Sequence, residues 1–368
     1  MEITNWVNLK MKIVQVSPRY HPYIGGVETV VKQISEEFVR QGHRVEVITI
    51  DPVGSLREVD ELNGVIIRRF KPTGPYYYSK PLMKHLSENT LQYNVIHAHN
   101  LHTFIPHMVV QATRAIKGHK LIVSGYYHGK GKTPLSTIFL RLYRPLIKGF
   151  LRQVNGITCV SNFEAGLIKK HFSIPENKIA LIPSGIMHED IKKAQPFHVT
   201  GHHLLIVSRL EKYKNIHLAI RAMPYLPDDY GLMIIGEGPY RPHLEKLVAN
   251  LNLKKRVQFL GRLPNEEVYR WYKTCDLVIN LSSLESFGLC VIEGLAAGKP
   301  VLVNNRTALG ELARQFEGVT AAEARKLHPR ELAEAIVQRM GAWCQEADLN
   351  EYRWDAIVER LLNYYIGL

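Results

Sequence analysis

Short, almost continuously apolar runs recur along the chain and are separated by polar or amphipathic stretches. Continuous apolar strands that alternate with helices are typical of a parallel sheet covered on both faces. The Asn63-Gly64 pair, a hairpin signal, stands directly before the run at 65–70 and allows an antiparallel excursion there. The runs form two series, one at 12–16, 44–50, 65–70, 95–99, 121–124, 156–160 and 179–182, the other at 204–208, 232–236, 257–261, 276–281 and 300–304.

The two series predict two α/β domains, each a Rossmann-like doubly wound sheet. At 368 residues the chain also exceeds the size of one usual core. We place the N-terminal domain at 1–190, the C-terminal domain at 191–350 and a terminal helical segment at 351–368, with the linker near 190–202. Ligands of doubly wound sheets bind beyond the carboxyl ends of the strands, so two facing sheets predict a cleft between the domains.

The charge of the chain is strongly positive and unevenly distributed. The formal net charge is +13, and the stretch 89–163 has no Asp or Glu. Such a field attracts phosphates, nucleic acid or an anionic membrane surface. Within the stretch 89–163, residues 135–154 predict an amphipathic helix suited to an anionic interface, or alternatively a core helix with a solvated basic side. The basic face consists of residues at 3-4-4 spacing, namely Arg141, Arg144, Lys148 and Arg152.

Targeting and redox signals are sparse. No run reaches the ~20 apolar residues of a membrane span, and residues 1–10 lack the apolar core of a signal peptide. Met11 is an alternative start to Met1. We predict a cytoplasmic protein, to which the basic helix adds the option of peripheral attachment at the inner face of the cell membrane. Buried free thiols of a reducing compartment are expected for the scattered cysteines, which are Cys159, Cys275, Cys290 and Cys344.

Glu285 and Glu293 stand eight residues apart where a predicted strand turns into a helix. The strand at 276–281 runs into a Ser-Ser turn, and Gly288 opens the helix. A glycine at a helix start exposes backbone N–H groups where the helix dipole favours negative charge. Continued as a helix, the spacing gives roughly 12 Å of rise. The catalytic carboxylates of glycosidases are only about 5–9.5 Å apart, so the two glutamates are expected to hold different parts of one long ligand.

Two further loops predict a grip on a diphosphate. Arg209 and Lys214 flank the turn after the strand at 204–208, and an arginine fork with a lysine point charge suits phosphates. Gly25 and Gly26 follow the first strand, where glycines permit backbone conformations closed to other residues and a close approach of a ligand. A solvated basic turn and a glycine-rich turn without a ligand are the alternatives. The sequence has no Asp-x-Asp, so no metal-bridged diphosphate is expected.

The segment 282–301, S-S-L-E-S-F-G-L-C-V-I-E-G-L-A-A-G-K-P-V, resembles the donor-site signature of retaining GT-B-fold glycosyltransferases of family 4, the glycosyl transferases group 1. The resemblance spans most of the chain, from Lys12 to Tyr365. It implies two facing Rossmann-like domains, a nucleotide-sugar donor and a terminal helix that crosses back onto the N-terminal domain. A helix that finishes the second domain is the alternative for the terminal segment.

The resemblance also implies roles for individual residues. Glu293 would hold the ribose hydroxyls, and Glu285 would orient sugar hydroxyls at the reacting end. His128, after the strand at 121–124, would lie near the transferred sugar, although a lone histidine is more often structural. The segment 261–263 matches the one whose backbone contacts the base. The implied donor-binding residues are Arg209, Lys214, Phe287, Gly288, Leu289, Glu293, Gly25, Gly26 and Arg262, and the implied catalytic residues are Glu285 and His128.

Two segments depart from the family pattern. The chain has Pro-Ser-Gly-Ile-Met at 183–187, where the family usually has Pro-Asn-Gly-x-Asp. It has Thr-Ala-Leu-Gly-Glu at 307–311, where the family has a Gly-rich loop leading to Glu. These differences leave open which sugar is bound and what Glu311 does.

These features predict an enzyme, a hexosyltransferase that needs no metal and no cofactor. It would move a hexose from a nucleotide-diphosphate sugar to a hydroxyl of a glycan, lipid or small molecule, with retention at the anomeric carbon. Another GT-B nucleotide-sugar enzyme, such as an epimerase, is the first alternative. A basic nucleic-acid-binding protein is the second, but no nucleic-acid module or stacking-aromatic pattern is visible, so no nucleic-acid partner is expected. The base, the sugar, the acceptor and the oligomeric state stay open.

Overall fold

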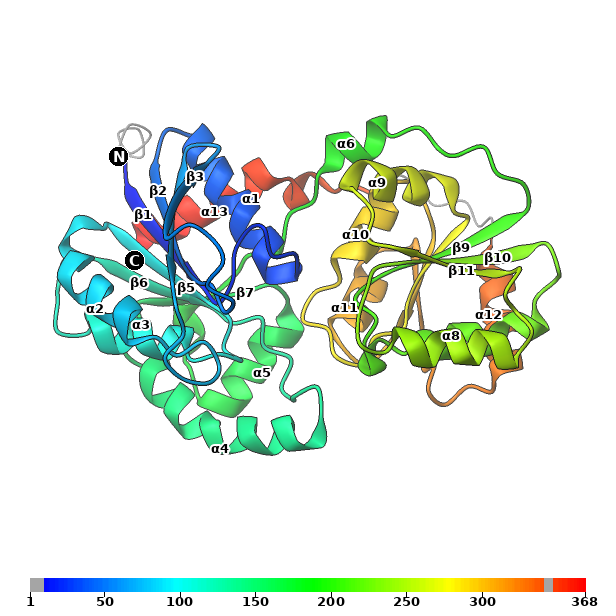
Figure 1. Ribbon diagram of the computed structural model, residues 1–368, viewed down its shortest axis with the longest axis horizontal. Coiled ribbons are helices and arrows are strands. Elements are labelled where there is room, and N and C mark those ends of the chain that lie inside the picture. The colour runs from blue at the N-terminus through cyan, green and yellow to red at the C-terminus, as the bar shows by residue number, and fades with distance from the viewer. Residues whose placement is uncertain (1–9, 341–346) are drawn as a thin grey trace. The chain divides into compact units, whose positions relative to one another are not determined.

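The computed structural model describes residues 10–340 and 347–368 (Figure 1). The described residues divide into two compact units: unit 1 comprises those up to Ser184 together with Trp354–Leu368, and unit 2 is Gly185–Arg353. The unit boundaries thus follow Ser184 and Arg353, whereas the sequence prediction placed them after residues 190 and 350. The predictions for Met1 and Cys344 concern residues outside the described ranges.

Unit 1 is built on a sheet whose described strands lie in the order β3-β4-β2-β1-β5-β6-β7-β8. The pairings are parallel except that of β3 with β4. Asn63 and Gly64 make the turn between these two strands, both with positive φ, so the hairpin predicted there is confirmed. The strands are β1 (Lys12–Ser17), β2 (Arg44–Ile50), β3 (Val59–Leu62), β4 (Val65–Phe70), β5 (Val95–His99), β6 (Lys120–Ser124), β7 (Gly156–Cys159) and β8 (Ile179–Leu181).

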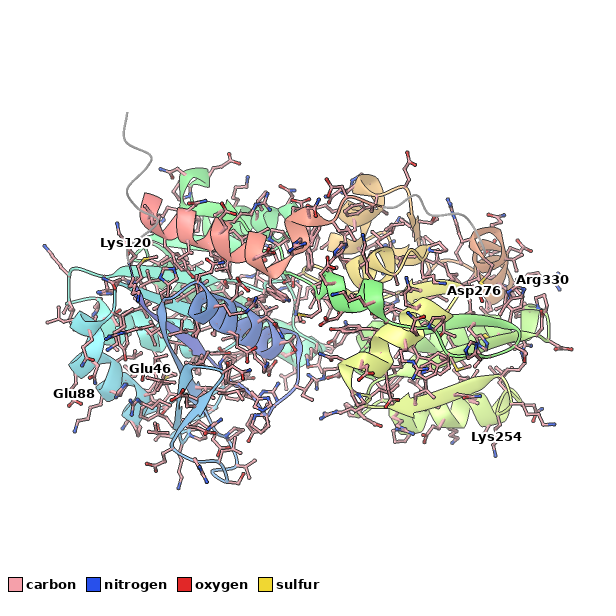
Figure 2. All side chains as sticks on the ribbon, turned by 90° about the horizontal axis from the view of Figure 1, so that it is seen from above. Glu46, Glu88, Lys120, Lys254, Asp276 and Arg330 are labelled. Carbon is pink, nitrogen blue, oxygen red and sulfur yellow. The ribbon has the colours of Figure 1, made fainter. Side chains whose placement is uncertain are left out.

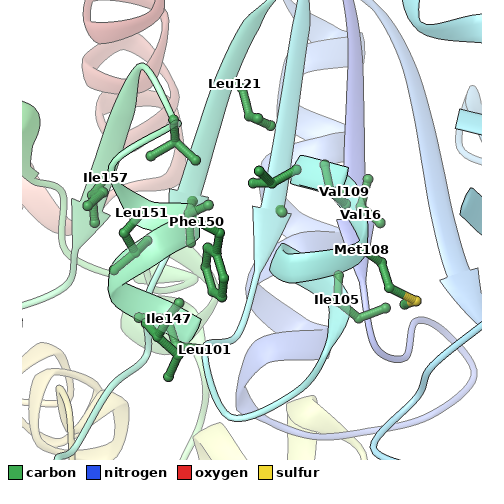
Figure 3. Close-up of a cluster of buried hydrophobic side chains, with 14 of the residues drawn as sticks. Val16, Leu101, Ile105, Met108, Val109, Leu121, Ile147, Phe150, Leu151 and Ile157 are labelled. Atoms are coloured by element: carbon green, nitrogen blue, oxygen red, sulfur yellow. The ribbon is translucent and has the colours of Figure 1, made fainter. Parts of the chain in front are cut away.

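Helices lie on both faces of this sheet (Figure 1). They are α1 (Gly26–Arg40), α2 (Lys80–Asn89), α3 (Ile105–Thr113), α4 (Pro134–Leu151), α5 (Asn162–Phe172) and α13 (Trp354–Gly367), with the short 3-10 helices η1 (Thr90–Gln92) and η2 (Glu176–Lys178). A core of buried aliphatic and aromatic side chains joins α3 and α4 to the sheet (Figure 3). It includes Val16, Ile105, Met108, Val109, Leu121, Ile147, Phe150, Leu151 and Ile157.

The C-terminal helix α13 belongs to unit 1, where two tyrosines fix it. The hydroxyl of Tyr365, a buried residue, lies 2.6 Å from Nδ1 of His97 on β5. The hydroxyl of Tyr364 accepts a hydrogen bond from the amide of Ile157 at 3.2 Å. Gly156 on β7 makes room for it, because a Cβ there would collide with that hydroxyl. The terminal helix therefore completes unit 1, not unit 2.

Unit 2 is built on a second sheet, whose described strands are all parallel and lie in the order β11-β10-β9-β12-β13-β14. The strands are β9 (His202–Val207), β10 (Tyr230–Ile235), β11 (Val257–Gly261), β12 (Leu277–Asn280), β13 (Val301–Asn304) and β14 (Val319–Ala322). The helices are α6 (His188–Lys193), α7 (Ile216–Ala222), α8 (Arg241–Asn250), α9 (Asn265–Thr274), α10 (Leu289–Ala296), α11 (Ala308–Gln315) and α12 (Pro329–Arg339), with η3 (Lys212–Lys214), η4 (Met223–Tyr225) and η5 (Asn350–Tyr352).

Glu46 on β2 is a buried carboxylate in unit 1, in contrast to Glu88, which points outward from α2 (Figure 2). Its oxygens accept hydrogen bonds from Nε of Arg68 and from the hydroxyl of Tyr93, each at 2.8 Å. Burial alone would raise the pKa of Glu46, but the neighbouring His85, whose Nε2 lies 3.8 Å away, and the hydrogen bonds from Arg68 and Tyr93 outweigh it and lower the pKa to about 2. The carboxylate is therefore ionised and stabilises this part of the sheet.

Candidate functional site

The candidate site of unit 2 lies where β9 and β12, neighbours in the sheet, end. The loop after β9 contains η3, and the loop after β12 is 281–288. Ser283 donates hydrogen bonds from its amide and its hydroxyl to the carbonyl of Tyr213, at 2.9 and 3.1 Å. The side-chain amide of Asn215 donates to the carbonyl of Leu281 at 2.8 Å. These bonds fix the two loops against each other at the edge of the sheet where doubly wound folds bind ligands.

Lys214 and Glu285 form an ion pair between these two loops. Nζ of Lys214 lies 2.7 Å from Oε2 of Glu285, and the two side chains are only 14% and 19% exposed. Burial alone would lower the pKa of Lys214, but the charges of Glu285 and Tyr213 and the hydrogen bond to Glu285 raise it above its ordinary value. Lys214 is thus a fixed cation at neutral pH. A cavity of about 10 Å³ adjoins it, lined also by Ser208 and Asn280.

Arg209 begins the same loop and is more exposed than Lys214. Its side chain is 50% exposed, and its guanidinium lies 3.1 Å from a carboxylate oxygen of Glu211. Ion pairs at the protein surface contribute only about 0–1 kcal/mol, and the guanidinium is half-exposed although Glu211 is 16% exposed, so Arg209 can turn toward a bound anion at little cost. The structure therefore places two cations, Arg209 and Lys214, on one loop at the end of β9.

Gly288 occupies a position that only glycine fits. Its φ is +115°, and a Cβ there would lie 2.7 Å from Cδ2 of Leu309 on α11. Within the described part of the chain no acceptor takes a hydrogen bond from the amides of Gly288, Leu289 or Cys290. These amides open α10, where the helix dipole favours an anion. Phe287, just before them, is 7% exposed, so its side chain anchors the loop in the core.

Glu293 lies on α10, one turn beyond these amides, and a tyrosine holds it. The hydroxyl of Tyr272 on α9 donates a hydrogen bond of 2.7 Å to Oε2 of Glu293, and Tyr272 is fully buried. Burial raises the pKa of Glu293, and the hydrogen bond from Tyr272 opposes that rise. Glu285, by contrast, precedes α10. Each carboxylate of the motif therefore has its own partner, Lys214 for Glu285 and Tyr272 for Glu293.

The loops after β9, β10 and β11 are joined through their main chains. The amide of Gly236, whose φ is +126°, donates to the carbonyl of Gly261 at 2.7 Å. Gly238 leaves no space for a Cβ against the main chain of Leu210. Arg262 follows Gly261 and is exposed. The structure thus connects the Arg262 segment to the Arg209 loop by backbone contacts and leaves the Arg262 side chain at the surface.

Gly25 and Gly26 belong to unit 1, at the start of α1. Gly25 has an extended φ of −178°, and Gly26 is the first helical residue. The prediction that these glycines adopt conformations closed to other residues is therefore wrong. A Cβ on Gly25 would displace the carboxylate of Glu28, the end of a flexible side chain that also pairs with Arg19 at 2.6 Å. A Cβ on Gly26 would meet nothing within 4 Å, which leaves its surface open to a ligand.

His128, also in unit 1, lies in the loop after β6. Its ring stacks on that of His102, with centroids 4.2 Å apart and planes at 22°. Burial lowers the pKa of His102 well below its ordinary value, and the charge of His128 adds to this. The two imidazoles therefore form a pair in which a second positive charge is unfavourable. His102 was not among the predicted site residues, although His97, His99 and His102 make a dense histidine series at the end of β5.

Glu164 is a second residue that was not predicted from the sequence. It is fully buried, and its carboxyl oxygens accept hydrogen bonds from the amides of Tyr127 at 2.6 Å and Val160 at 2.8 Å. It thereby joins the loop of His128 to the end of β7. Burial raises the pKa of Glu164 to about 8, against the effect of these two hydrogen bonds. A glutamate three residues after Ser161, the N-cap of α5, is the sequence signal that was available.

Helix α4 has both a core side and an exposed apolar side. Leu140, Tyr143 and Ile147 are buried, whereas the exposed large apolar residues are Leu135, Ile138, Phe139, Leu142 and Leu146. The prediction that Arg144 belongs to a solvated basic face is wrong. Arg144 turns inward, where its Nε donates to the hydroxyl of Tyr127 at 3.1 Å and its terminal nitrogen to the carbonyl of Gly129 at 2.9 Å. Arg141 and Arg152 are exposed as predicted, and Lys148 is partly so.

Residues 10–340 and 347–368 hold neither of two features of function, a metal-binding cluster and a membrane-spanning helix. These residues contain no group of three or more His, Cys, Asp or Glu side chains placed to hold a metal ion. None of their helices combines the length and apolar character needed to span a bilayer.

Two family models match the chain in succession. The model described as Glycosyltransferase Family 4 matches residues 24–190, and the model described as Glycosyl transferases group 1 matches residues 187–352. The chain is 27% identical to an uncharacterized glycosyltransferase of Methanocaldococcus jannaschii, over 96% of this chain and 98% of that protein. It is 26% identical to the alpha-monoglucosyldiacylglycerol synthase of Streptococcus pneumoniae, over 93% of this chain and 80% of that protein.

Solved structures share the fold at low sequence identity. Sucrose-phosphate synthase from Thermosynechococcus elongatus aligns with a TM-score of 0.81 at 19% identity, over 97% of this chain and 99% of that one. Anabaena HepE in complex with UDP and glucose aligns with a TM-score of 0.74 at 18% identity, over 97% of this chain and 100% of that one. The predicted GT-B class, with two parallel-sheet α/β domains, is thereby confirmed.

Proposed function

The chain belongs to the group 1 and family 4 glycosyltransferases, and from this premise we propose a specific reaction for it. It moves a hexose from a nucleotide-diphosphate sugar to a hydroxyl of a lipid or glycan acceptor, with retention at the anomeric carbon and without a metal ion. The UDP and glucose held by the Anabaena structure support the donor class. The diacylglycerol in the name of the Streptococcus relative supports a lipid acceptor.

The observation that carries the proposal is the pairing of Lys214 with Glu285 beside the open amides at the start of α10. A nucleoside diphosphate leaves with two negative charges to be stabilised, and cations and oriented amides fixed before the reaction are the effective means. Lys214 is such a cation, and the amides of Gly288 and Leu289 are such dipoles. Arg209, on the same loop as Lys214, adds a fork that suits phosphate oxygens.

The two carboxylates take different parts of the donor. Glu285 gives one oxygen to Lys214 and keeps the other for hydroxyls of the sugar at the reacting end. Glu293 accepts hydrogen bonds from the ribose hydroxyls, a direct use of a carboxylate. No protein nucleophile is assigned. The acceptor hydroxyl attacks the face from which the diphosphate departs, and a phosphate oxygen takes its proton.

The test is a thermal-shift screen followed by an activity assay. UDP, GDP, ADP and their hexose derivatives are screened with EDTA present, because a ligand that binds only the folded state raises the melting temperature. The donor thus found is then incubated with extracted lipids and with oligosaccharides. We expect release of free nucleoside diphosphate only when an acceptor is added. Release without an acceptor would indicate an epimerase or hydrolase, and no stabilisation by any nucleotide would contradict the proposal.

We further propose that the enzyme works at an anionic membrane surface, which α4 contacts. Leu135 and Leu142 are each 77% exposed on this helix. Arg141 lies between them and Arg152 follows the helix, both exposed. An exposed apolar stripe flanked by cations matches an anionic bilayer interface, where apolar side chains enter the acyl boundary and cations meet headgroups.

Vesicle sedimentation tests this attachment. We expect binding to anionic vesicles at low salt that weakens as salt screens the charges. The double variant Leu135→Ser/Leu142→Ser should bind at least tenfold more weakly, because burying one leucine contributes about 1.5–3 kcal/mol. The matched control is Leu91→Ser, since Leu91 is 80% exposed on η1 of the same unit. Equal binding to neutral vesicles, or equal losses in both variants, would count against α4 as the docking element.

A further inference from the structure

We propose that Tyr272 is the positioning residue for Glu293 and thereby sets the preference of the enzyme for a ribose over a deoxyribose in the donor. This inference rests on the proposed function, in which Glu293 binds the ribose hydroxyls. Tyr272 lies on α9, ahead of β12, and Glu293 on α10, after β12. Their side chains meet in one hydrogen bond of 2.7 Å, from the tyrosine hydroxyl to Oε2 of the carboxylate. Both residues belong to unit 2, so the contact lies within one compact body.

One carboxylate oxygen of Glu293 accepts the hydrogen bond from Tyr272, and the other can accept hydrogen bonds from a ligand. Tyr272 is 0% exposed and its ring is enclosed by the core, so its hydroxyl cannot follow a moving carboxylate. A carboxylate held at Oε2 has little freedom about its last torsions, and Oε1 is left to accept hydrogen bonds from a ligand. A carboxylate that is already held in place binds vicinal ribose hydroxyls more tightly than a free one. Ordering a free side chain on binding has an entropic cost, which reduces the binding free energy.

The electrostatic surroundings of Glu293 agree with this assignment. The charge of Glu293 adds to burial in raising the pKa values of Tyr269 and Tyr272 on α9 and of Cys290 on α10. Burial disfavours the ionised form of Glu293, and the hydrogen bond from Tyr272 favours it. Tyr272 is thus the neighbour that both holds the carboxylate in place and supports its charge.

A different result is expected if the hydrogen bond between Tyr272 and Glu293 only stabilises the packing of α9 against α10. Loss of a fastening bond would weaken the binding of all nucleotides together or lower the melting temperature. Loss of a positioning bond would weaken only those ligands that use Glu293. The measurement that separates the two is therefore the ratio of affinities for a ribonucleoside diphosphate and its 2′,3′-dideoxy analogue.

The experiment compares Tyr272→Phe with Tyr269→Phe by calorimetric titration of both nucleotides. Tyr269 is also buried on α9 and faces Glu293, but its hydroxyl makes no hydrogen bond within the described residues. For the wild type and Tyr269→Phe we expect the same preference for the ribonucleotide. For Tyr272→Phe we expect that preference to fall about tenfold, with the affinity for the dideoxy analogue unchanged. An unchanged preference in Tyr272→Phe would overturn the inference.

Two additional measurements keep the outcomes distinct. In a Glu293→Ala background, which has no acceptor for the Tyr272 hydroxyl, the further change Tyr272→Phe should not alter the ribose preference, because Tyr272 acts only through Glu293; a tenfold change there would refute this. If the wild type bound both analogues equally, the ribose role of Glu293 in the proposed function would fail. If the wild type discriminated and Tyr272→Phe did so to the same extent, only the role of Tyr272 would fail. Melting temperatures of all variants identify any that lose the fold.

Discussion

Replacing Glu285 by Gln should weaken the folded state and yet leave nucleotide binding intact. The substitution removes the counter-charge of Lys214 at 2.7 Å, in a pair whose side chains are only 14% and 19% exposed. Lys214 then keeps its positive charge in a mostly buried position without a counter-ion. A bound diphosphate can supply the missing negative charge. We therefore expect a variant that is less stable when empty and binds the nucleoside diphosphate as tightly as the wild type, or more tightly.

The size of the effect follows from the burial of the pair. Removing one partner of a fully buried ion pair costs about 3–5 kcal/mol, because an uncompensated charge remains. The pair here is partly exposed, and Gln can still accept a hydrogen bond from Nζ of Lys214. We therefore expect a loss of about 2 kcal/mol, which for a unit of this size lowers the melting temperature by about 4–8 °C.

The assay is thermal unfolding of Glu285→Gln, Lys214→Met and the double variant, with and without the nucleoside diphosphate. The double variant should lose less than the sum of the single losses, since neither charge is left alone. The control is Glu176→Gln, because Glu176 pairs with Lys169 at 2.9 Å with side chains 85% and 42% exposed, and its loss should stay below about 1 kcal/mol. Additive losses, or a nucleotide affinity of Glu285→Gln reduced tenfold, would refute this account of the pair. Turnover by Glu285→Gln at the wild-type rate with saturating donor would refute the sugar-orienting role.

Three further outcomes are expected. Gly288→Ala should lower the free energy of unfolding by about 1–3 kcal/mol, because φ is +115° and a Cβ would press on Leu309; a denaturation curve that matches the wild type would contradict this. Gly26→Ala should keep the melting temperature, since a Cβ there meets nothing within 4 Å, but should raise the donor KM; an unchanged KM would mean that no ligand approaches this glycine. The pKa of Glu46 is lowered from 4.5 to about 2, so its stabilisation is fully present above pH 4.5 and lost as the pH falls toward 2. Glu46→Gln should therefore flatten the acid limb of a stability–pH curve, whereas Glu88→Gln should not.

The fold could be predicted from the sequence where strands are buried on both faces. Such strands are almost continuously apolar, as at 121–124 and 204–208, and these runs are recognisable in the sequence. The short edge strands β3 and β14 were not predicted, because neither is a run of large apolar residues: β3 is Val-Asp-Glu-Leu and β14 is Val-Thr-Ala-Ala. Helical spacing in the terminal segment could not say which unit it packs on. Tyr364 and Tyr365 decide that through contacts with strands far away in the sequence.

The candidate site could be predicted as a set of residues but not as a set of contacts. The sequence marks Arg209, Lys214 and Glu285 by their positions after strands. It does not show that two of them neutralise each other, because the loops that carry them are joined only in the folded sheet. It also led to a wrong expectation for Gly25, since residue type does not reveal that φ is extended there. Tyr272 could not be predicted from the sequence, because its proposed role depends on one hydrogen bond between two helices.

The central claim is that fixed cations and helix amides of unit 2 bind the diphosphate of the donor without a metal ion. Calorimetric titration of the preferred nucleoside diphosphate into wild type and Lys214→Met, with EDTA throughout, tests it most directly. We predict binding by the wild type under these conditions. We predict an affinity about 10- to 100-fold lower for Lys214→Met, as expected for the loss of a charged hydrogen bond of about 1.5–3 kcal/mol. Binding that requires added Mg²⁺, or equal affinities for the two proteins, would contradict the claim.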